Sequence, residues 1–321
     1  MQKLYNYTCS CLYLSERREL LNLITVIGSI AMDLVITTDQ IPSAGETLFG
    51  ESFSIVPGGK GANQGVAIAR LAPNQTNLIG CVGQDSFARD ALENFQKNQL
   101  NFEFVKEVPG STGVASIILY EKDNRILVIP GANNQVNSAD WKGEWELLKK
   151  SDMVVLQNEI PHKTNLEIAK FCHLNQVKVL YNPAPTRPTD QEMIPYVDFF
   201  TPNEHECEVL FPGLPLEDVL ARYPNKLVVT LGSKGVTFHD GDQVVSVPAV
   251  KVDPIDTTGA GDTFNGAFAF AISRGLNITQ SCRFAVIVAS LSVLKFGAQG
   301  GMPTLSQVKE HRAYEKAWNL E

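Results

Sequence analysis

The chain has 321 residues, enough for one large domain or two ordinary ones, and 44% of them are hydrophobic and 19% charged. This composition excludes a disordered chain, a collagen-like fibre and a coiled coil. The formal charge is −8, from 27 basic and 35 acidic residues, and no basic run exceeds a pair, so a nucleic-acid or membrane-surface partner is not expected. No apolar run approaches the roughly 18 residues of a membrane-spanning helix.

The cysteines and the N-terminus bear on the cellular compartment. The six cysteines are scattered without a CxxC spacing, which argues against a zinc site or a disulfide framework and favours a reducing, cytoplasmic compartment. Residues 1–22 lack the basic start, apolar run and cleavage site of a secretory signal. We expect them to form a disordered or loosely docked extension without a function of its own.

From Leu23 onward, apolar runs typical of buried strands alternate with helical patterns. The predicted strands are 23–30, 77–82, 151–157, 177–182, 198–201 and 226–231. The predicted helices are 63–71, 85–99, 164–174, one from Asn203, about 259–274 and 278–295. Such alternation is typical of βαβ units, so the predicted fold class is α/β, with a mostly parallel sheet covered by helices on both faces.

Two stretches, 33–57 and 112–130, contain strand patterns with no helix between them. Within the second stretch, Lys122-Asp123-Asn124 has the composition of a hairpin turn. The two stretches could form a small antiparallel sheet that projects from the main domain, or an extra edge of the main sheet. The pattern alone leaves both possibilities open.

The segment 256–266, DTTGAGDTFNG, places two glycines at the start of a predicted helix. Gly259 and Gly261 permit a tight turn, and the N–H groups of the first helical turn then form an anion site. Asp262 in that turn is either a helix cap or a general base beside a transferring phosphoryl group. The sequence has no GxxxxGK[ST] loop, which excludes a P-loop NTPase.

A second glycine-rich segment, 57–65 (PGGKGANQG), precedes another predicted helix. It implies a close approach of the backbone to a ligand or a neighbouring element, and Lys60 and Asn63 could donate hydrogen bonds to a polyhydroxy ligand. Asp33 follows the first apolar strand, where a charge is costly unless it faces solvent or a ligand. A carboxylate at this position could accept hydrogen bonds from sugar hydroxyls.

Together, these two glycine-rich segments resemble the signature segments of the ribokinase-like carbohydrate kinases, and the resemblance covers about residues 23–305. It implies a three-layer α/β/α domain at 23–321, with a small β-sheet lid from the stretches 33–57 and 112–130 that also forms a homodimer interface. It further implies transfer of the ATP γ-phosphate to the 5-hydroxyl of D-ribose, which would feed pentose phosphate and nucleotide metabolism.

The resemblance also implies roles for individual residues. Asp262 would be the catalytic base, with the N–H groups of Gly259, Ala260 and Gly261 as the anion hole. The residues that would bind the sugar, together with Asp262, are Ala31, Met32, Asp33, Gly59, Lys60, Gly61, Ala62, Asn63 and Glu159. The residues that would bind ATP and its Mg²⁺, together with Gly261 and Asp262, are Asn203, Glu206, Thr230, Leu231, Gly232, Ser233, Lys234 and Gly235.

A potassium ion is also implied by the resemblance. Its ligands would come from Asp256, Thr258, Ser292, Lys295, Gly297 and Gly301. This set supplies one full negative charge, which suits a large monovalent cation better than a divalent one.

One position departs from the family pattern. Ala31 stands where these kinases often have Asn or Ser to meet a sugar hydroxyl, so the preference between ribose and 2-deoxyribose is open. A hexose or nucleoside kinase is a further alternative within the family. A non-catalytic sugar or nucleotide sensor on the same fold is an alternative of another class, and the intact motif around Asp262 argues against it.

Overall fold

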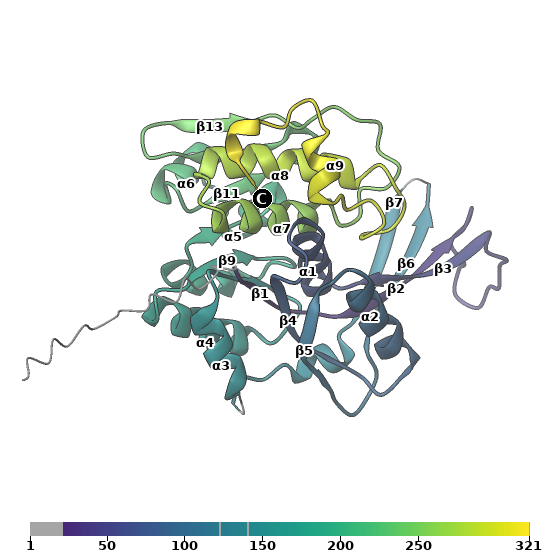
Figure 1. Cartoon of the computed structure of the whole chain (residues 1–321). Helices are drawn as coiled ribbons and strands as arrows, with labels where there is room; N and C mark the ends of the chain where they lie inside the picture. Colours follow the sequence, from purple (N-terminus) through teal and green to yellow (C-terminus); the bar gives the residue numbers. More distant parts are fainter. Residues whose placement is uncertain (1–21, 122, 140, 321) are drawn as a thin grey trace, which may run out of the picture.

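The computed structural model describes residues 22–121, 123–139 and 141–320 (Figure 1). The extension predicted at 1–22 therefore lies, apart from Asn22, outside the described residues. A central sheet with helices on both faces forms the body of the molecule, and a smaller sheet projects from one side. This arrangement confirms the predicted three-layer α/β class.

The central sheet has six strands, all parallel, in the order β10-β9-β8-β1-β4-β5. Their bounds are Ile24–Ile27 (β1), Thr76–Val82 (β4), Asn101–Glu107 (β5), Met153–Gln157 (β8), Lys178–Asn182 (β9) and Phe199–Phe200 (β10). A three-stranded antiparallel sheet follows, formed by Val228–Thr230 (β11), Val236–His239 (β12) and Val244–Val247 (β13). Backbone bridges from Phe200 to Leu227 and from Asn203 to Thr230 join it to the β10 edge.

The alternation of side chains along the strands builds two apolar cores, one on each face of the central sheet. In β1, Ile24 and Val26 belong to the first core and Ile27 to the second. The long helices that contribute to the first core are Lys60–Leu71 (α1), Ser86–Lys97 (α2), Ala260–Ser273 (α7) and Ile278–Ser292 (α8). Those that contribute to the second are Gly143–Lys150 (α3), His162–Leu174 (α4), Glu204–Leu210 (α5) and Leu216–Arg222 (α6).

The remaining elements are short. They are the helix Leu305–Lys309 (α9) and the 3-10 segments Gly131–Gln135 (η1), Pro188–Tyr196 (η2), Gly232–Lys234 (η3) and Lys316–Trp318 (η4). Within the part of the chain that the structure describes, no helix has the length and apolar character needed to cross a membrane.

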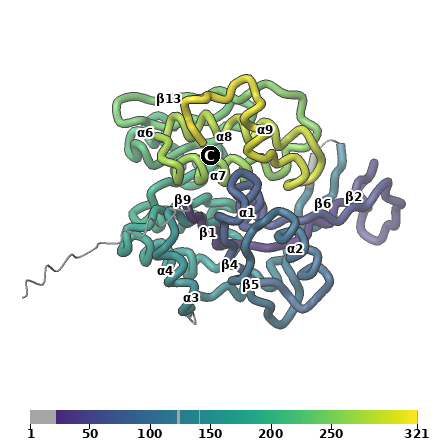
Figure 2. Tube along the Cα trace, in the orientation of Figure 1, coloured from purple at the N-terminus to yellow at the C-terminus, as the bar shows by residue number. Residues whose placement is uncertain are grey.

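The two helix-free stretches pair with each other in a separate four-stranded sheet, which we call the small sheet. Its order is β3-β2-β6-β7, with bounds Ala31–Thr37 (β2), Ser52–Gly58 (β3), Gly113–Tyr120 (β6) and Asp123–Ile129 (β7). The outer pairs are antiparallel, whereas β2 and β6 run parallel at its centre. In the tube view (Figure 2), β2 and β6 extend away from the main body.

The strand order places a crevice at the carboxyl end of β1. Strands that follow β1 along the chain lie on one side of it (β4, β5) and then on the other (β8, β9, β10), and ligands of open α/β sheets bind at such a reversal. Gly28 follows β1 there, and an added Cβ would lie 2.8 Å from the Cα of Gly61. The start of α1 therefore lies directly against the carboxyl end of β1.

Candidate active site

A pocket of about 150 Å³ lies at this crevice, beside the small sheet. The residues predicted from the sequence that line it are Ala31, Asp33, Gly59, Lys60, Asn63, Glu159, Thr258, Gly259 and Asp262. The remaining lining residues come from β6, β7 and the segment after them: Ala115, Ile117, Ile126, Val128, Ile129, Pro130 and Asn133. Predicted residues from four distant segments of the chain thus share one pocket.

Asp262 lies in the first turn of α7 and is 6% exposed. Its Oδ2 accepts a hydrogen bond from Nδ2 of Asn63, and its Oδ1 accepts one from Nε2 of Gln64, both at 3.0 Å. Both donors belong to α1, and the N-cap position of α7, Gly259, has no side-chain cap. The carboxylate is therefore held by donors from outside its own helix. Each oxygen keeps a further lone pair that can accept a proton.

Glu159 follows β8 and forms another wall of the pocket. Its Oε2 accepts hydrogen bonds from Oγ of Ser29 at 2.5 Å and from the backbone N–H of Lys60 at 3.0 Å. The second bond satisfies one of the N–H groups that lack a partner in a first helical turn. This explains why α1 begins at Lys60, three residues before the predicted start at 63.

The charges in the pocket shift one another's pKa values. Burial, reinforced by the carboxylates of Glu159 and Asp262, raises the pKa of Asp33 from 3.8 to about 7. Burial alone would lower the pKa of Lys60, but Asp262, Glu159, Glu206 and Asp33 together raise it. The pocket therefore holds a charged lysine beside several carboxyl groups, a donor and acceptor set that suits a ligand with many hydroxyls.

The glycine turn before α7 has the predicted character. Gly259 has a φ of 76°, in the left-handed region that favours glycine, and an added Cβ would lie 2.5 Å from the carbonyl oxygen of Ala298. At Gly261, an added Cβ would meet no described atom within 4 Å beyond its chain neighbours and the backbone of its own helix. Space for a ligand therefore adjoins this turn, whose first N–H groups suit an anion. The N–H of Ala260 donates to the carbonyl of Thr257 at 3.2 Å, so a phosphate oxygen would have to compete for this donor.

The two segments predicted to hold a potassium ion meet beside the glycine turn. Asp256 accepts hydrogen bonds from the N–H of Thr258 at 2.9 Å through Oδ1 and from the N–H of Gly297 at 2.8 Å through Oδ2. Gly301 lies so close to Ser292 that an added Cβ would stand 1.8 Å from the Ser292 carbonyl oxygen. A carboxylate beside backbone carbonyls is a donor set that fits a monovalent cation. Among the described residues, no group of three His, Cys, Asp or Glu side chains could hold a metal ion.

The segments predicted to bind the nucleotide adjoin one another. Asn203 and Glu206 form a capping box at the start of α5, with reciprocal backbone-to-side-chain hydrogen bonds of 2.8 Å. Thr230 ends β11 and bridges to Asn203, so the loop 231–235 begins beside this helix start. Burial raises the pKa of Glu206 and the charge of Asp262 raises it further, which places Glu206 within electrostatic reach of the pocket.

Among the predicted site residues that do not line the pocket are Met32, Gly61, Ala62 and Lys295. Met32 points to the opposite face of β2 from its pocket-lining neighbours, because side chains alternate along a strand, and it is buried in the first core. Gly61 and Ala62 are buried in α1, away from the lining. The side chain of Lys295 is exposed, so its backbone carbonyl is the group available to a cation.

The lining residues from β6, β7 and the segment after them were not predicted as site residues. Two polar residues that form hydrogen bonds at the site were also missed from the sequence. Gln64 holds Asp262, as described above, and Asn133 brackets the backbone of Ile30, donating to its carbonyl at 2.9 Å and accepting from its N–H at 2.8 Å. Gln64 lies in the second glycine-rich segment, next to Asn63. Its amide side chain in that segment was the sequence feature that could have identified it as a site residue. Asn133 follows the small sheet, and no spacing in the sequence connects it with Ile30.

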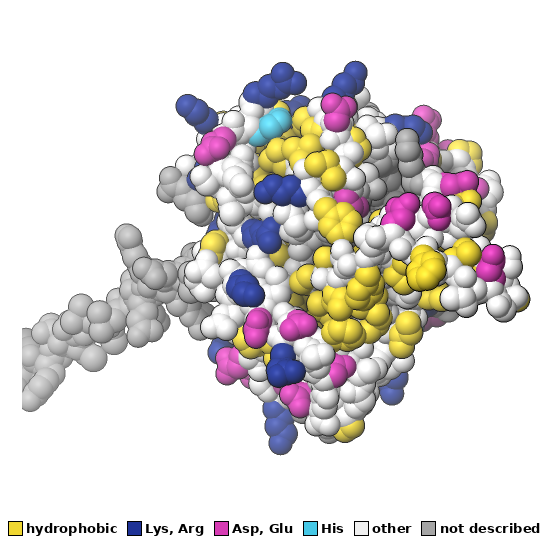
Figure 3. Space-filling view, turned by 90° about the vertical axis from the view of Figure 1, so that its right-hand side faces the viewer, with side chains coloured by type: hydrophobic (Ala, Val, Ile, Leu, Met, Phe, Trp, Pro, Cys, Tyr) yellow, Lys and Arg dark blue, Asp and Glu magenta, His cyan; other side chains and the backbone are white. Residues whose placement is uncertain are grey.

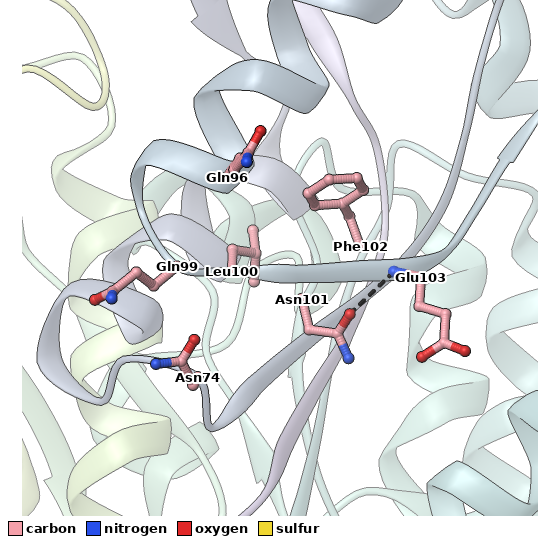
Figure 4. Close-up of a pocket in the computed structure, with 7 residues that line it drawn as sticks. All are labelled: Asn74, Gln96, Gln99, Leu100, Asn101, Phe102 and Glu103. Atoms are coloured by element: carbon pink, nitrogen blue, oxygen red, sulfur yellow. Dashed lines mark hydrogen bonds between the residues drawn. The ribbon is translucent and has the colours of Figure 1, made fainter.

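A larger hollow of about 540 Å³ lies elsewhere, at the amino-terminal end of β5 (Figure 4). Its lining residues are Asn74, Gln96, Gln99, Leu100, Asn101, Phe102 and Glu103. On β5, Oδ1 of Asn101 accepts a hydrogen bond from the N–H of Glu103 at 3.1 Å. None of the predicted site residues lines this hollow, so the smaller pocket is the candidate active site.

The comparison with known proteins agrees with this geometry. Residues 21–305 match the family model of the pfkB family carbohydrate kinases. The chain belongs to the pfkB family. As a pfkB carbohydrate kinase it is a phosphotransferase that acts on a sugar. The match confirms the family recognised in the sequence.

Among the relatives of this pfkB kinase, a ribokinase of Lactococcus lactis subsp. lactis is 60% identical over 286 residues, which cover 89% of this chain and 95% of that protein. A ribokinase of Bacillus subtilis is 48% identical over 288 residues, covering 89% of this chain and 98% of that protein. The structure of Arabidopsis thaliana ribokinase complexed with ribose and ATP is similar with a TM-score of 0.82 and 30% identity, covering 89% of this chain and 97% of that one.

Proposed function

We propose that this kinase transfers the γ-phosphoryl group of ATP to the 5-hydroxyl of D-ribose. The observation that carries the proposal is the buried carboxylate of Asp262, which stands beside the glycine turn and lines a pocket with other carboxyl groups able to bind sugar hydroxyls. The 60% identical ribokinase and the similar structure with ribose and ATP support the choice of substrates. We place the reaction in the cytoplasm, where its product would feed pentose phosphate and nucleotide metabolism.

Asp262 acts as the general base in this mechanism. As the sugar 5-oxygen attacks the γ-phosphorus, its proton passes to a carboxylate oxygen, and the bond from the γ-phosphorus to the β–γ bridging oxygen breaks to release ADP. Asn63 and Gln64 already hold the carboxylate from both sides, so it needs little reorientation. The N–H groups of residues 259–261 stabilise the negative charge on the transferring phosphoryl oxygens.

The sugar is held by groups of opposite hydrogen-bonding character. Asp33 and Glu159 accept hydrogen bonds from its hydroxyls, and Lys60 donates to them. The small sheet acts as a lid, and Ile126 and Val128, which are 48% and 53% exposed, cover the sugar when the lid closes. Closure excludes water, which would otherwise compete with the sugar as the phosphoryl acceptor.

The nucleotide side would bind ATP with Mg²⁺. Asn203 and Glu206 lie at the start of α5 with oxygen atoms suited to this hard cation, directly or through water. Bound there, Mg²⁺ would neutralise charge on the phosphates. The loop 231–235 would lie against the nucleotide, where Gly235 has a φ of 103° that a residue with a side chain rarely adopts.

A potassium ion would support the anion-binding turn. Its ligands would be the carboxylate of Asp256 and the backbone oxygens of Thr258, Ser292, Lys295, Gly297 and Gly301. The hydrogen bond from Gly297 to Asp256 and the contact of Gly301 with Ser292 support this assignment, since they bring the two segments together. An ion held there would fix the backbone that leads into Gly259.

We also propose a homodimer formed through the small sheets. Phe53, Ile55 and Leu127 are exposed apolar side chains of this sheet that do not line the pocket, and Leu127 is 71% exposed. Figure 3 faces this side of the molecule and shows hydrophobic side chains gathered there. Apolar surface of this kind is typical of an interface between proteins.

A second candidate substrate is 2-deoxyribose. The position of Ala31 in the pocket favours it, because a methyl group there cannot hydrogen-bond to a sugar hydroxyl.

The test of the proposed function is direct measurement of ADP formed by the purified protein with ribose, 2-deoxyribose, fructose or adenosine, with ³¹P NMR to locate the phosphate. The highest kcat/KM with ribose and phosphate at O5 supports the proposal. A higher kcat/KM with 2-deoxyribose would identify that sugar as the substrate. If no acceptor is phosphorylated, the proposed kinase activity is refuted and a non-catalytic sensor is favoured.

A further inference from the structure

A chain of hydrogen bonds between side chains runs from the outer end of α1 to the carboxylate of Asp262. It begins at Arg70 in the last turn of α1, whose Nε donates to Oδ1 of Asn98 at 2.7 Å. Nδ2 of Asn98 donates to Oδ1 of Asn94 at 3.1 Å, one turn back along α2. Nδ2 of Asn94 then donates to Oε1 of Gln299 at 2.8 Å. These contacts connect α1, α2 and the loop after α8.

The inner half of the chain is buried. Nε2 of Gln299 donates to Oδ1 of Asn63 at 2.9 Å, and Nδ2 of Asn63 donates to Oδ2 of Asp262 at 3.0 Å. Gln299, Asn63 and Asp262 are each 5–6% exposed. Because water cannot readily replace a partner here, each broken bond would leave a buried polar atom unsatisfied.

The chemistry of the two ends fixes the direction of every bond between them. A guanidinium can only donate hydrogen bonds, and an ionised carboxylate can only accept them. Each of the four amides between Arg70 and Asp262 therefore receives a bond at its oxygen and gives one from its nitrogen. If one amide rotated by 180°, its oxygen would face another oxygen at one contact, and its N–H would face another N–H at the other.

Arg70 also holds the backbone that presents Gln299. Its Nη1 donates to the carbonyl oxygens of Gln299 and Met302, each at 2.7 Å. The same guanidinium therefore fixes both the position of the Gln299 backbone and, through the two asparagines of α2, the orientation of its side chain.

We propose that Arg70, Asn98, Asn94 and Gln299 are positioning residues for the catalytic base. They orient the amide of Asn63 so that its N–H, and not its oxygen, faces Asp262. With Oδ2 held in this way, the carboxylate keeps a lone pair toward the sugar hydroxyl. This inference rests on the proposed function, because it gives these residues a role only if Asp262 accepts the proton.

Asn94→Asp tests the proposal with a change of almost no volume at a residue outside the pocket. The substitution replaces the N–H that faces Gln299 with an oxygen, which favours reversal of the Gln299 amide and then of Asn63. We expect kcat to fall by roughly 10- to 100-fold, while KM for ribose and for ATP changes less than about threefold. Asn77→Asp is the control: Asn77 is a buried amide that lies outside the chain and accepts a bond from Asn101, and its own Nδ2 has no partner among the described residues.

A double-mutant cycle separates positioning from general damage to the fold. In an Asp262→Ala background, Asn94→Asp should leave the residual rate unchanged, because no carboxylate remains to be oriented. An equal fold-decrease in both backgrounds, or the wild-type kcat in Asn94→Asp alone, overturns the proposal. If Asn94→Asp does not fold, Asn98→Asp, one bond further from Asp262, serves in the same cycle with the same criteria. The wild-type protein in the same assay tests the proposed function separately: if it turns over no sugar, both that function and the positioning role are refuted.

Discussion

Asp33→Asn should stabilise the unliganded protein while it weakens sugar binding. The pKa of Asp33 is raised from 3.8 to about 7, chiefly by burial, and the side chain is 7% exposed. The folded protein therefore binds a proton between these pH values that the unfolded chain has already released, and its stability falls as the pH rises through this range. Three pH units at about 1.4 kcal/mol each give a cost of about 4 kcal/mol above pH 7. Asparagine has nearly the same shape and carries no charge, so it avoids this cost.

The assay is urea unfolding of wild-type protein and Asp33→Asn at pH 5 and pH 8. The free energy of unfolding of the variant should exceed that of wild type by about 1.5 kcal/mol at pH 5 and by about 4 kcal/mol at pH 8, because at pH 5 only about one pH unit above the unfolded pKa of 3.8 contributes, whereas at pH 8 the whole interval up to about 7 contributes. An equal difference at both pH values would refute the reasoning, as would a variant less stable than wild type at pH 8.

The same pKa predicts a proton release when the sugar binds to the wild-type protein. Hydroxyls that donate to the Asp33 carboxylate favour its ionised form and lower its pKa, so a site that is about half protonated at pH 7 gives up its proton. Calorimetric titration with ribose at pH 7 in two buffers of different ionisation enthalpy measures this release. Asp33→Asn should show weaker binding and no such difference between the buffers, and a buffer difference that persists in the variant would assign the proton to another group.

Four further outcomes follow from the site and the small sheet. Asp262→Asn should lower kcat by roughly 10³-fold with nearly unchanged ATP affinity by calorimetry, and retained turnover would contradict the general base. Gly259→Ala should lower both kcat and the thermal unfolding temperature because its Cβ would lie 2.5 Å from a carbonyl oxygen, whereas Gly261→Ala, which has open space, should lower kcat alone. ADP formation should be faster in potassium than in sodium at equal ionic strength, and equal rates would remove the potassium site. Leu127→Glu should convert a dimer to a monomer in light scattering while Leu174→Glu, at an 81% exposed position on α4, should not, and a dimer that persists would refute the small-sheet interface.

Much of the site could be predicted because its residues stand at the ends of regular elements. Glu159 follows the buried strand β8 and Asp262 opens α7, and those places meet in an open α/β fold, whereas Asp33 lies inside β2. The partners of Asp262 could not be predicted, because they depend on how closely α1 and α7 pack. An added Cβ on Gly266 would lie 2.8 Å from the Cβ of Ala67, and no spacing within either helix encodes that approach.

The elements missed from the sequence are short or lie at the edge of a sheet. The edge strand β5 alternates charged and apolar residues, and α3 and α6 have 8 and 7 residues, too short for a clear helical period. β12 and β13 have 4 residues each. Their pairing is decided by the neighbouring strand more than by their own pattern. The longer buried elements, by contrast, matched the prediction to within a few residues.

Helix α1 touches both ends of the proposed reaction. Its first N–H is bound by Glu159, beside the sugar, and its next turn holds the carboxylate of Asp262. The distance between Glu159, which would bind the sugar, and Asp262, which would deprotonate it, is therefore set by the position of α1, which packs against Gly28. A longer acceptor would need a larger distance between the carboxylates of Glu159 and Asp262, and this requires a shift of α1. Replacing the side chains around the pocket with smaller ones would leave that distance unchanged.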